Sequence, residues 1–221
     1  MTVEEYLKRN GVHPVSIRDI SDRHRRVVQI DNDSQYYPEF FSTGLDDFVE
    51  GVDFDLNSEM FDRLVAEIKD AKDVFEPCCQ SGLLGCYVAS QPNKPRYKGI
   101  DLSEEGIAKA KARALKNDLD PKIFSVDDLM MYDGQHEVTI GRHIINTRNN
   151  LVINRDYLGK LTEISPKIVM IQIAPRIMEH QVVQACESAF GQRHYSFEVL
   201  GMYATSKASG ESVFLSQALK Q

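Results

Sequence analysis

The chain has 221 residues, 42% of them hydrophobic, which is enough to bury the core of one sizeable domain. A net charge of −7 and a pI near 5.4 disfavour a dedicated nucleic-acid surface, because phosphate binding depends on clustered lysine and arginine. No apolar run approaches the length of a membrane span, and the polar, acidic start lacks the apolar region of a signal peptide. We therefore expect a cytoplasmic protein with no membrane or nucleic-acid partner.

The cysteines do not indicate a metal or redox site. Cys78 and Cys79 are adjacent, which is not the Cys-x-x-Cys spacing of zinc and redox motifs, and Cys86 and Cys186 stand apart. We expect reduced thiols that behave as small apolar residues, and we predict no metal ion.

Alternating strand and helix patterns occupy most of the chain. A helical pattern with apolar residues at helix spacing begins after Asn57. Two β-rich runs close the chain, and the short link between them is too brief for a crossover helix, so they should pair as an antiparallel hairpin. The expected strands are 73–76, 97–102, 122–126, 137–141, 167–173, 195–204 and 212–219, and the expected helices are 82–90, 103–116, 151–164 and 176–190.

The turn after the first expected strand is the first candidate for a ligand site. Glu76 ends the strand, and Pro77-Cys78-Cys79-Gln80-Ser81-Gly82 leads into a helix, as in nucleotide-binding α/β units. Glycines at such turns let the backbone bend sharply and approach a ligand. Because Cys78 and Gln80 carry a Cβ, we expect ordinary dihedral angles at both, or a greater distance from the ligand.

Three stretches together resemble the class I S-adenosylmethionine (SAM) dependent methyltransferases. The first is similar to the family's (Asp/Glu)-x-Gly-x-Gly-x-Gly motif, with Cys78 and Gln80 in its first two glycine positions. Gly99-Ile100-Asp101-Leu102-Ser103 is similar to the second motif, and Phe124-Ser125-Val126-Asp127-Asp128 to the third. The resemblance implies a doubly wound α/β fold with a mostly parallel seven-stranded sheet and a C-terminal antiparallel hairpin. It covers roughly 57–221, which leaves 1–56 as a helical or irregular N-terminal lid.

The resemblance also implies a cofactor site for SAM. Asp101, at the end of the second strand, would accept hydrogen bonds from the ribose hydroxyls, and Leu102 would lie against the adenine. Asp127 would accept from the adenine amino group, and the backbone N–H of Asp128 would meet a ring nitrogen. The alternative is that these acids cap loops and helices. The cofactor-binding residues expected on this basis are Glu76, Cys78, Gln80, Gly82, Asp101, Leu102, Asp127 and Asp128.

Candidates for the acceptor side follow the fourth strand. His143 is a possible general base, and Arg142 a substrate ligand, although a structural role is the alternative for both. The other five histidines form no visible constellation. Four cations of the 103–116 helix are interpreted as a solvated face rather than a nucleic-acid patch: Lys109, Lys111, Arg113 and Lys116.

The segment 31–60 has no lysine or arginine but carries nine acidic residues and six aromatic ones. So many aromatics need burial, and the segment has no clean period. We predict a lid in which Tyr36, Tyr37 and Phe41 line the acceptor pocket, where carboxylates and aromatic faces favour a cationic, amine-bearing guest. The alternative is a surface loop packed on the sheet edge.

Three functions are compatible with these patterns. The first is SAM-dependent methyl transfer to a small molecule, with His143 as the catalytic residue. The second is a catalytically silent binding or partner protein of the same fold, suggested by Cys78 and Gln80 in glycine positions; SAM binding would separate the two. The third is an NAD-dependent dehydrogenase, which the missing first glycine and the terminal hairpin disfavour. The sequence does not indicate the oligomeric state.

Overall fold

A computed structural model describes residues 5–6, 9–10, 58–142, 145–146, 152–204 and 211–221. Its centre is a seven-stranded sheet in the order β3-β2-β1-β4-β7-β9-β8. The first five strands of this order run parallel, whereas β9 is antiparallel to both β7 and β8. The strands are β1 (Asp73–Pro77), β2 (Arg96–Asp101), β3 (Phe124–Val126), β4 (Val138–Arg142), β7 (Lys167–Pro175), β8 (Tyr195–Ala204) and β9 (Glu211–Lys220). The α/β class, the mixed sheet and the terminal hairpin are confirmed.

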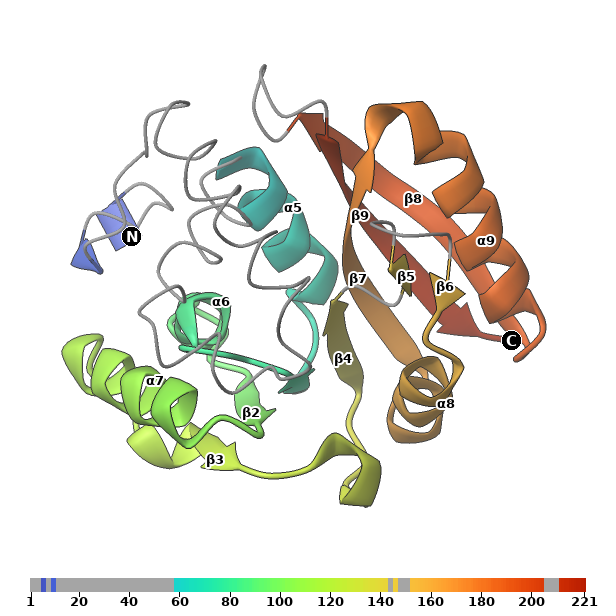
Figure 1. The fold of residues 1–221 in the computed structure, drawn as a ribbon. Helices are drawn as coiled ribbons and strands as arrows, with labels where there is room; N and C mark the ends of the chain where they lie inside the picture. The colour runs from blue at the N-terminus through green and yellow to red at the C-terminus, as the bar shows by residue number, and fades with distance from the viewer. Residues whose placement is uncertain (1–4, 7–8, 11–57, 143–144, 147–151, 205–210) are drawn as a thin grey trace, which may run out of the picture.

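Helices cover both faces of the sheet, as Figure 1 shows. One apolar cluster joins the sheet to α5 (Ser58–Ile68), α6 (Leu83–Ala89) and α7 (Glu104–Lys116). A second cluster lies on the other face and includes α8 (Arg155–Ile164) and α9 (Glu179–Gly191). Two separate buried clusters are what a doubly wound sheet requires, because each face of a parallel sheet must be covered.

Residues near the start of the chain pack into the first cluster. Tyr6 is completely buried there, its ring lies 5.1 Å from that of Tyr87, and its hydroxyl donates to the carbonyl of Leu83 at 2.5 Å. Asn10 and Asn117 exchange side-chain hydrogen bonds of 3.4 and 3.0 Å. The described residues at the N-terminus are thus anchored to α6 and to the end of α7.

A few local elements differ from the sequence prediction. Residues 145–146 and 152–153 form a small antiparallel pair, β5 and β6, so α8 begins later than expected. Short 3₁₀ turns precede β3, follow it and precede α9: η1 (Pro121–Ile123), η2 (Leu129–Met131) and η3 (Arg176–Met178). Across the described residues, no helix combines the length and apolar character that crossing a bilayer requires.

Candidate functional site

The turn after β1 lies at the carboxyl ends of the strands and adopts an unusual backbone. Cys78, Gln80 and Gly82 all have positive φ, at 54°, 51° and 72°. Of the two alternatives predicted for Cys78 and Gln80, ordinary dihedral angles are therefore wrong, because both residues take the left-handed conformation that favours glycine; the greater distance from the ligand stays a prediction. For a residue with a Cβ that conformation costs on the order of 1–3 kcal/mol and persists only when surrounding contacts enforce it.

Hydrogen bonds from neighbouring elements hold this turn. The N–H of Cys79 donates to the carbonyl of Ile100 at 3.0 Å, and the N–H of Gln80 donates to Asp101 Oδ2 at 2.9 Å. Gly82 closes the turn by donating to the carbonyl of Cys79 at 2.9 Å. The first two bonds tie the turn to the end of β2, since Ile100 and Asp101 are the last residues of that strand.

Gly82 has no room for a side chain. A Cβ there would lie 2.7 Å from the Phe124 ring and 2.8 Å from the Cβ of Ala110. The third glycine position of the motif is therefore required both by its backbone angle and by the packing of α6 against α7 and β3.

Asp101 joins the turn to the candidate ribose site. Its side chain is largely buried, with 9% of the residue exposed; Oδ2 accepts from Gln80 and Oδ1 accepts from the Ser103 N–H at 2.9 Å. Each carboxylate oxygen has a second lone pair, so these two bonds leave acceptor capacity for hydroxyl donors. Leu102 follows directly with 70% of its surface exposed.

Asp127 and Asp128 lie beside Asp101. The N–H of Asp127 donates to the carbonyl of Asp101 at 3.1 Å, which ties the end of β3 to that of β2. The exposed carboxylate of Asp127 accepts from the Asp128 N–H at 2.9 Å, and Asp128 caps η2 by accepting from Met130 N at 2.9 Å. In this structure the N–H of Asp128, the expected partner of an adenine nitrogen, is bonded within the loop.

Two side chains of the turn have groups suited to a ligand. The Sγ-bearing side chain of Cys78 is exposed, whereas Cys79, Cys86 and Cys186 are buried. Gln80 Oε1 is buried and has no hydrogen-bond partner among the described residues. A buried amide oxygen without a donor is unfavourable, so a donor from a bound molecule or water would stabilise it.

Glu76 is oriented inward. It is completely buried, and the hydroxyl of Tyr97 donates to its carboxylate. Burial, and then the Glu76 carboxylate, raise the pKa of Tyr97 well above its usual value. Gly85 on α6 makes room for the phenol, since a Cβ there would come within 2.2 Å of its oxygen. The hydrogen bond thus joins Glu76 on β1 to Tyr97 on β2, whose phenol packs against α6 at Gly85.

Several predicted site residues fall where side chains are not described. β4 ends at Arg142, at the carboxyl edge of the sheet next to β1 and β7. His143 lies outside the described residues, and so do Tyr36, Tyr37 and Phe41. Their assignment to the acceptor side, and the lid over 1–56, stay predictions.

Arg113 contacts the candidate site, although the sequence was interpreted otherwise. Its guanidinium is half-buried, and Nη1 donates to both the carbonyl and the hydroxyl of Ser81, each at 2.6 Å. The interpretation of Arg113 as part of a solvated face is therefore wrong, while Lys111 and Lys116 are exposed as expected. Helix periodicity gave no signal for this contact, because exposed Lys111, like Arg113, is next to one of the buried residues Ala110 and Ala114 and three residues from the other.

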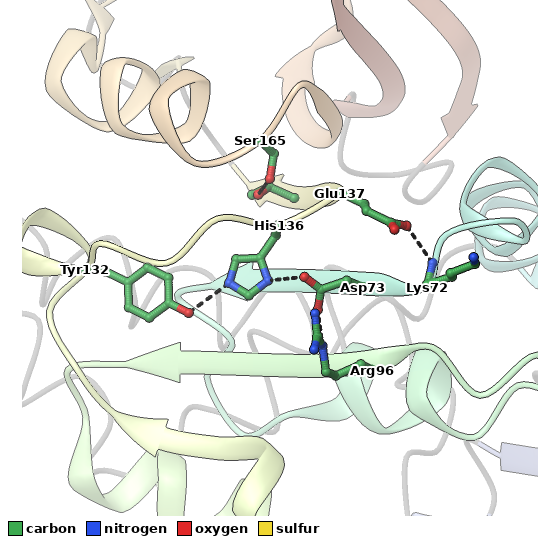
Figure 2. A network of polar contacts seen from close by, with 8 residues as sticks. Lys72, Asp73, Arg96, Tyr132, His136, Glu137 and Ser165 are labelled. Atoms are coloured by element: carbon green, nitrogen blue, oxygen red, sulfur yellow. Dashed lines mark hydrogen bonds and ion pairs between the residues drawn. The ribbon is translucent and has the colours of Figure 1, made fainter.

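A second polar network lies at the other end of the strands, at the amino ends of β1 and β2. Figure 2 shows His136 between Tyr132 and Asp73: Nε2 is 2.8 Å from the Tyr132 hydroxyl and Nδ1 is 2.9 Å from Asp73 Oδ2. Arg96 donates to the other oxygen of Asp73 at 3.0 Å. His136 does belong to a constellation, contrary to expectation. Since Asp73 begins β1, the network joins the amino ends of the strands, away from the candidate site.

Comparisons with known proteins match this geometry at the level of the fold. No protein-family model matches the chain, and no curated protein matches it. Among solved structures, magnesium protoporphyrin IX methyltransferase from Synechocystis PCC 6803 with bound S-adenosylhomocysteine (SAH) has a TM-score of 0.56 at 14% identity, over 74% of this chain and 83% of that one. The fold is that of the class I SAM-dependent methyltransferases.

Two further methyltransferases have the same fold. A putative RNA methyltransferase from Pyrococcus horikoshii has a TM-score of 0.54 at 14% identity, over 74% of this chain and 80% of that one. A ribosomal protein L11 methylase from Lactobacillus delbrueckii has a TM-score of 0.53 at 13% identity, over 73% of this chain and 78% of that one. The methyltransferase fold thus accommodates very different acceptors, so the acceptor of this chain does not follow from the fold.

Proposed function

We propose that the chain binds SAM at the carboxyl ends of β1, β2 and β3 and transfers its methyl group to a small molecule. The observation that carries the proposal is Asp101: a carboxylate at the end of β2 that is bonded to the turn after β1 and retains acceptor capacity. Ligands of α/β sheets bind at such strand ends. Asp101 would hold the ribose hydroxyls, and the exposed Leu102 would cover an adenine face.

The remaining cofactor residues follow from the same arrangement. Asp127 presents an exposed carboxylate next to Asp101, suited to an amino donor. Cys78 and Gln80 lie on the turn where the amino-acid end of the cofactor would bind, and Gln80 Oε1, which has no hydrogen-bond partner within the part of the chain that the structure describes, suits an ammonium donor. Glu76 would act through the backbone of the turn. The bound cofactor supplies an electrophilic methyl group on a sulfonium.

Methyl transfer asks the chain for alignment and a deprotonated acceptor rather than for a metal or a triad. We assign His143 the role of general base and Arg142 that of a substrate ligand, because Arg142 ends β4 at the carboxyl end of the sheet and His143 is the next residue in the sequence. An amine-bearing acceptor is supported by the acidic and aromatic composition around Tyr36, Tyr37 and Phe41.

A second function, a catalytically silent member of the fold, is favoured by two observations. Cys78 and Gln80 add side chains at the two positions where a glycine would leave the backbone open, and the N–H of Asp128 is bonded to Asp127. In this function the chain would bind a nucleoside-type ligand or a protein partner without turnover.

A cycle of protein and ligand changes tests the cofactor assignment. Asp101→Asn alone disturbs the turn as well as the ribose, so the affinities of SAH and of its 2′-deoxy form are compared in parent and variant by calorimetry. In the parent, loss of the hydroxyl should weaken binding by about tenfold to a hundredfold, because a hydrogen bond to a charged group contributes ~1.5–3 kcal/mol. In Asp101→Asn the penalty should shrink to about threefold or less. An equal penalty in both proteins would contradict the assignment.

A further inference from the structure

We propose that Arg113 is a positioning residue for the cofactor turn, residues 78–82, and that it helps to hold Cys78 and Gln80 in the left-handed conformation that glycines would otherwise supply. The inference rests on the proposed function, because it concerns the same turn. It assigns to the α7 helix a role that its sequence, with cations spaced along one side, does not suggest.

The contact is specific and comes from a distant part of the chain. Arg113 lies 32 residues after Ser81, and its Nη1 is 2.6 Å from both the backbone oxygen and the side-chain oxygen of Ser81. Ser81 is buried and stands between Gln80 and Gly82, two of the three residues in this turn with positive φ. The guanidinium therefore fixes the direction of the Ser81 carbonyl in the middle of the turn.

Asp101 restrains Gln80, the residue before Ser81, and it does so as a hydrogen-bond acceptor rather than as a donor. Its carboxylate accepts the N–H of Gln80, while the guanidinium donates to the carbonyl of Ser81. The two charged groups thus orient the donor of one residue and the acceptor of the next. Charge-assisted hydrogen bonds are about twice as strong as neutral ones, so this pair is suited to enforcing an unfavourable backbone.

The need for such restraint follows from the residues in the turn. Glycine takes positive φ almost as readily as negative φ, whereas Cys78 and Gln80, with a Cβ, do so only under constraint. If Arg113 supplies the constraint, its removal should release the turn in this sequence. Its removal should matter less when both positions carry glycine.

The first measurement needs no cofactor. Cys78 is exposed and Cys79 is buried beside it, so the native protein should have one rapidly labelled thiol in the turn. In Arg113→Gln, maleimide labelling followed by peptide mass spectrometry should show rapid modification of Cys79 as well. Lys111→Gln, an exposed cation on the same helix, is the matched control and should label like the parent. Protection of Cys79 in folded Arg113→Gln would overturn the proposal.

The second measurement is the affinity for SAH. Arg113→Gln should bind about tenfold more weakly than the parent and Lys111→Gln, and adding Cys78→Gly and Gln80→Gly should recover most of that loss. If the two glycine substitutions do not recover the SAH affinity of Arg113→Gln, Arg113 has a purely structural role in α7, and the proposal is overturned. If Arg113→Gln does not fold, Ser81→Ala, which removes the hydroxyl that accepts from Arg113 and leaves the carbonyl contact, is scored by the same two criteria. If the parent itself does not bind SAH, the proposed function fails, and the thiol measurement alone decides the role of Arg113.

Discussion

Replacing Tyr97 by phenylalanine tests whether the buried Glu76 is held in place by its hydrogen bond. Phenylalanine keeps the ring and its edge contact with Phe124, whose centroid lies 5.6 Å away, so the change removes only the hydroxyl. The loss is one charge-assisted hydrogen bond to a completely buried carboxylate. Such a bond contributes ~1.5–3 kcal/mol, so the free energy of unfolding should fall by about that amount.

Urea unfolding followed by circular dichroism measures this change. The midpoint should move to lower urea with the slope unchanged, because the exposed area on unfolding is nearly the same. Tyr195→Phe is the matched control: that hydroxyl donates to the uncharged carbonyls of Thr162 and Ser165, at 3.0 and 2.6 Å, and its loss should cost only ~0.5–1.5 kcal/mol. A Tyr97→Phe cost below ~0.5 kcal/mol, or one no larger than that of the control, would refute the role assigned to the pair.

Three further changes have expected outcomes. Stability should fall as pH rises above about 10, because the folded pKa of Tyr97 is raised above the unfolded value near 10, so the unfolded chain loses its proton first; Tyr97→Phe should show a shallower fall, and equal slopes in alkaline urea titrations would count against the burial of the phenol. Gly82→Ala should cost about 2 kcal/mol or more, since its φ is positive and its Cβ would lie 2.7 Å from Phe124; a smaller loss in thermal unfolding would contradict that packing. Cys78→Gly should leave the free energy of unfolding unchanged or raise it by up to ~1 kcal/mol, because the strain of the left-handed backbone is relieved while glycine increases the conformational entropy of the unfolded chain. A clear loss of stability would argue that the thiol has a packing role.

The sheet was predictable because its signals are local. Most strands are runs rich in apolar residues, and the brief link before β9 excludes a crossover helix. The pair β5 and β6 was missed because two-residue strands are too short to show a period. The strand-end position of Asp101 was predictable for the same local reason, since the strand preceding it is well marked.

The restraints on the turn were not predictable, because they depend on contacts across the fold. The sequence indicates that Cys78 and Gln80 occupy glycine positions, and steric preference then favours ordinary dihedral angles. The opposite outcome depends on Asp101, 21 residues after Gln80, and on Arg113, 32 residues after Ser81. The inward orientation of Glu76 likewise depends on Tyr97, on the neighbouring strand. Tertiary contacts here override local preference.

The measurement that bears most directly on the account is calorimetric titration of the parent chain with SAH. The account predicts saturable binding at one site per chain, competition by SAM, and protection of Cys78 from maleimide when SAH is bound, because the exposed thiol lies on the turn that would hold the cofactor. The absence of saturable heat, or binding that leaves the labelling rate of Cys78 unchanged, would contradict the placement of the cofactor at the carboxyl ends of β1, β2 and β3.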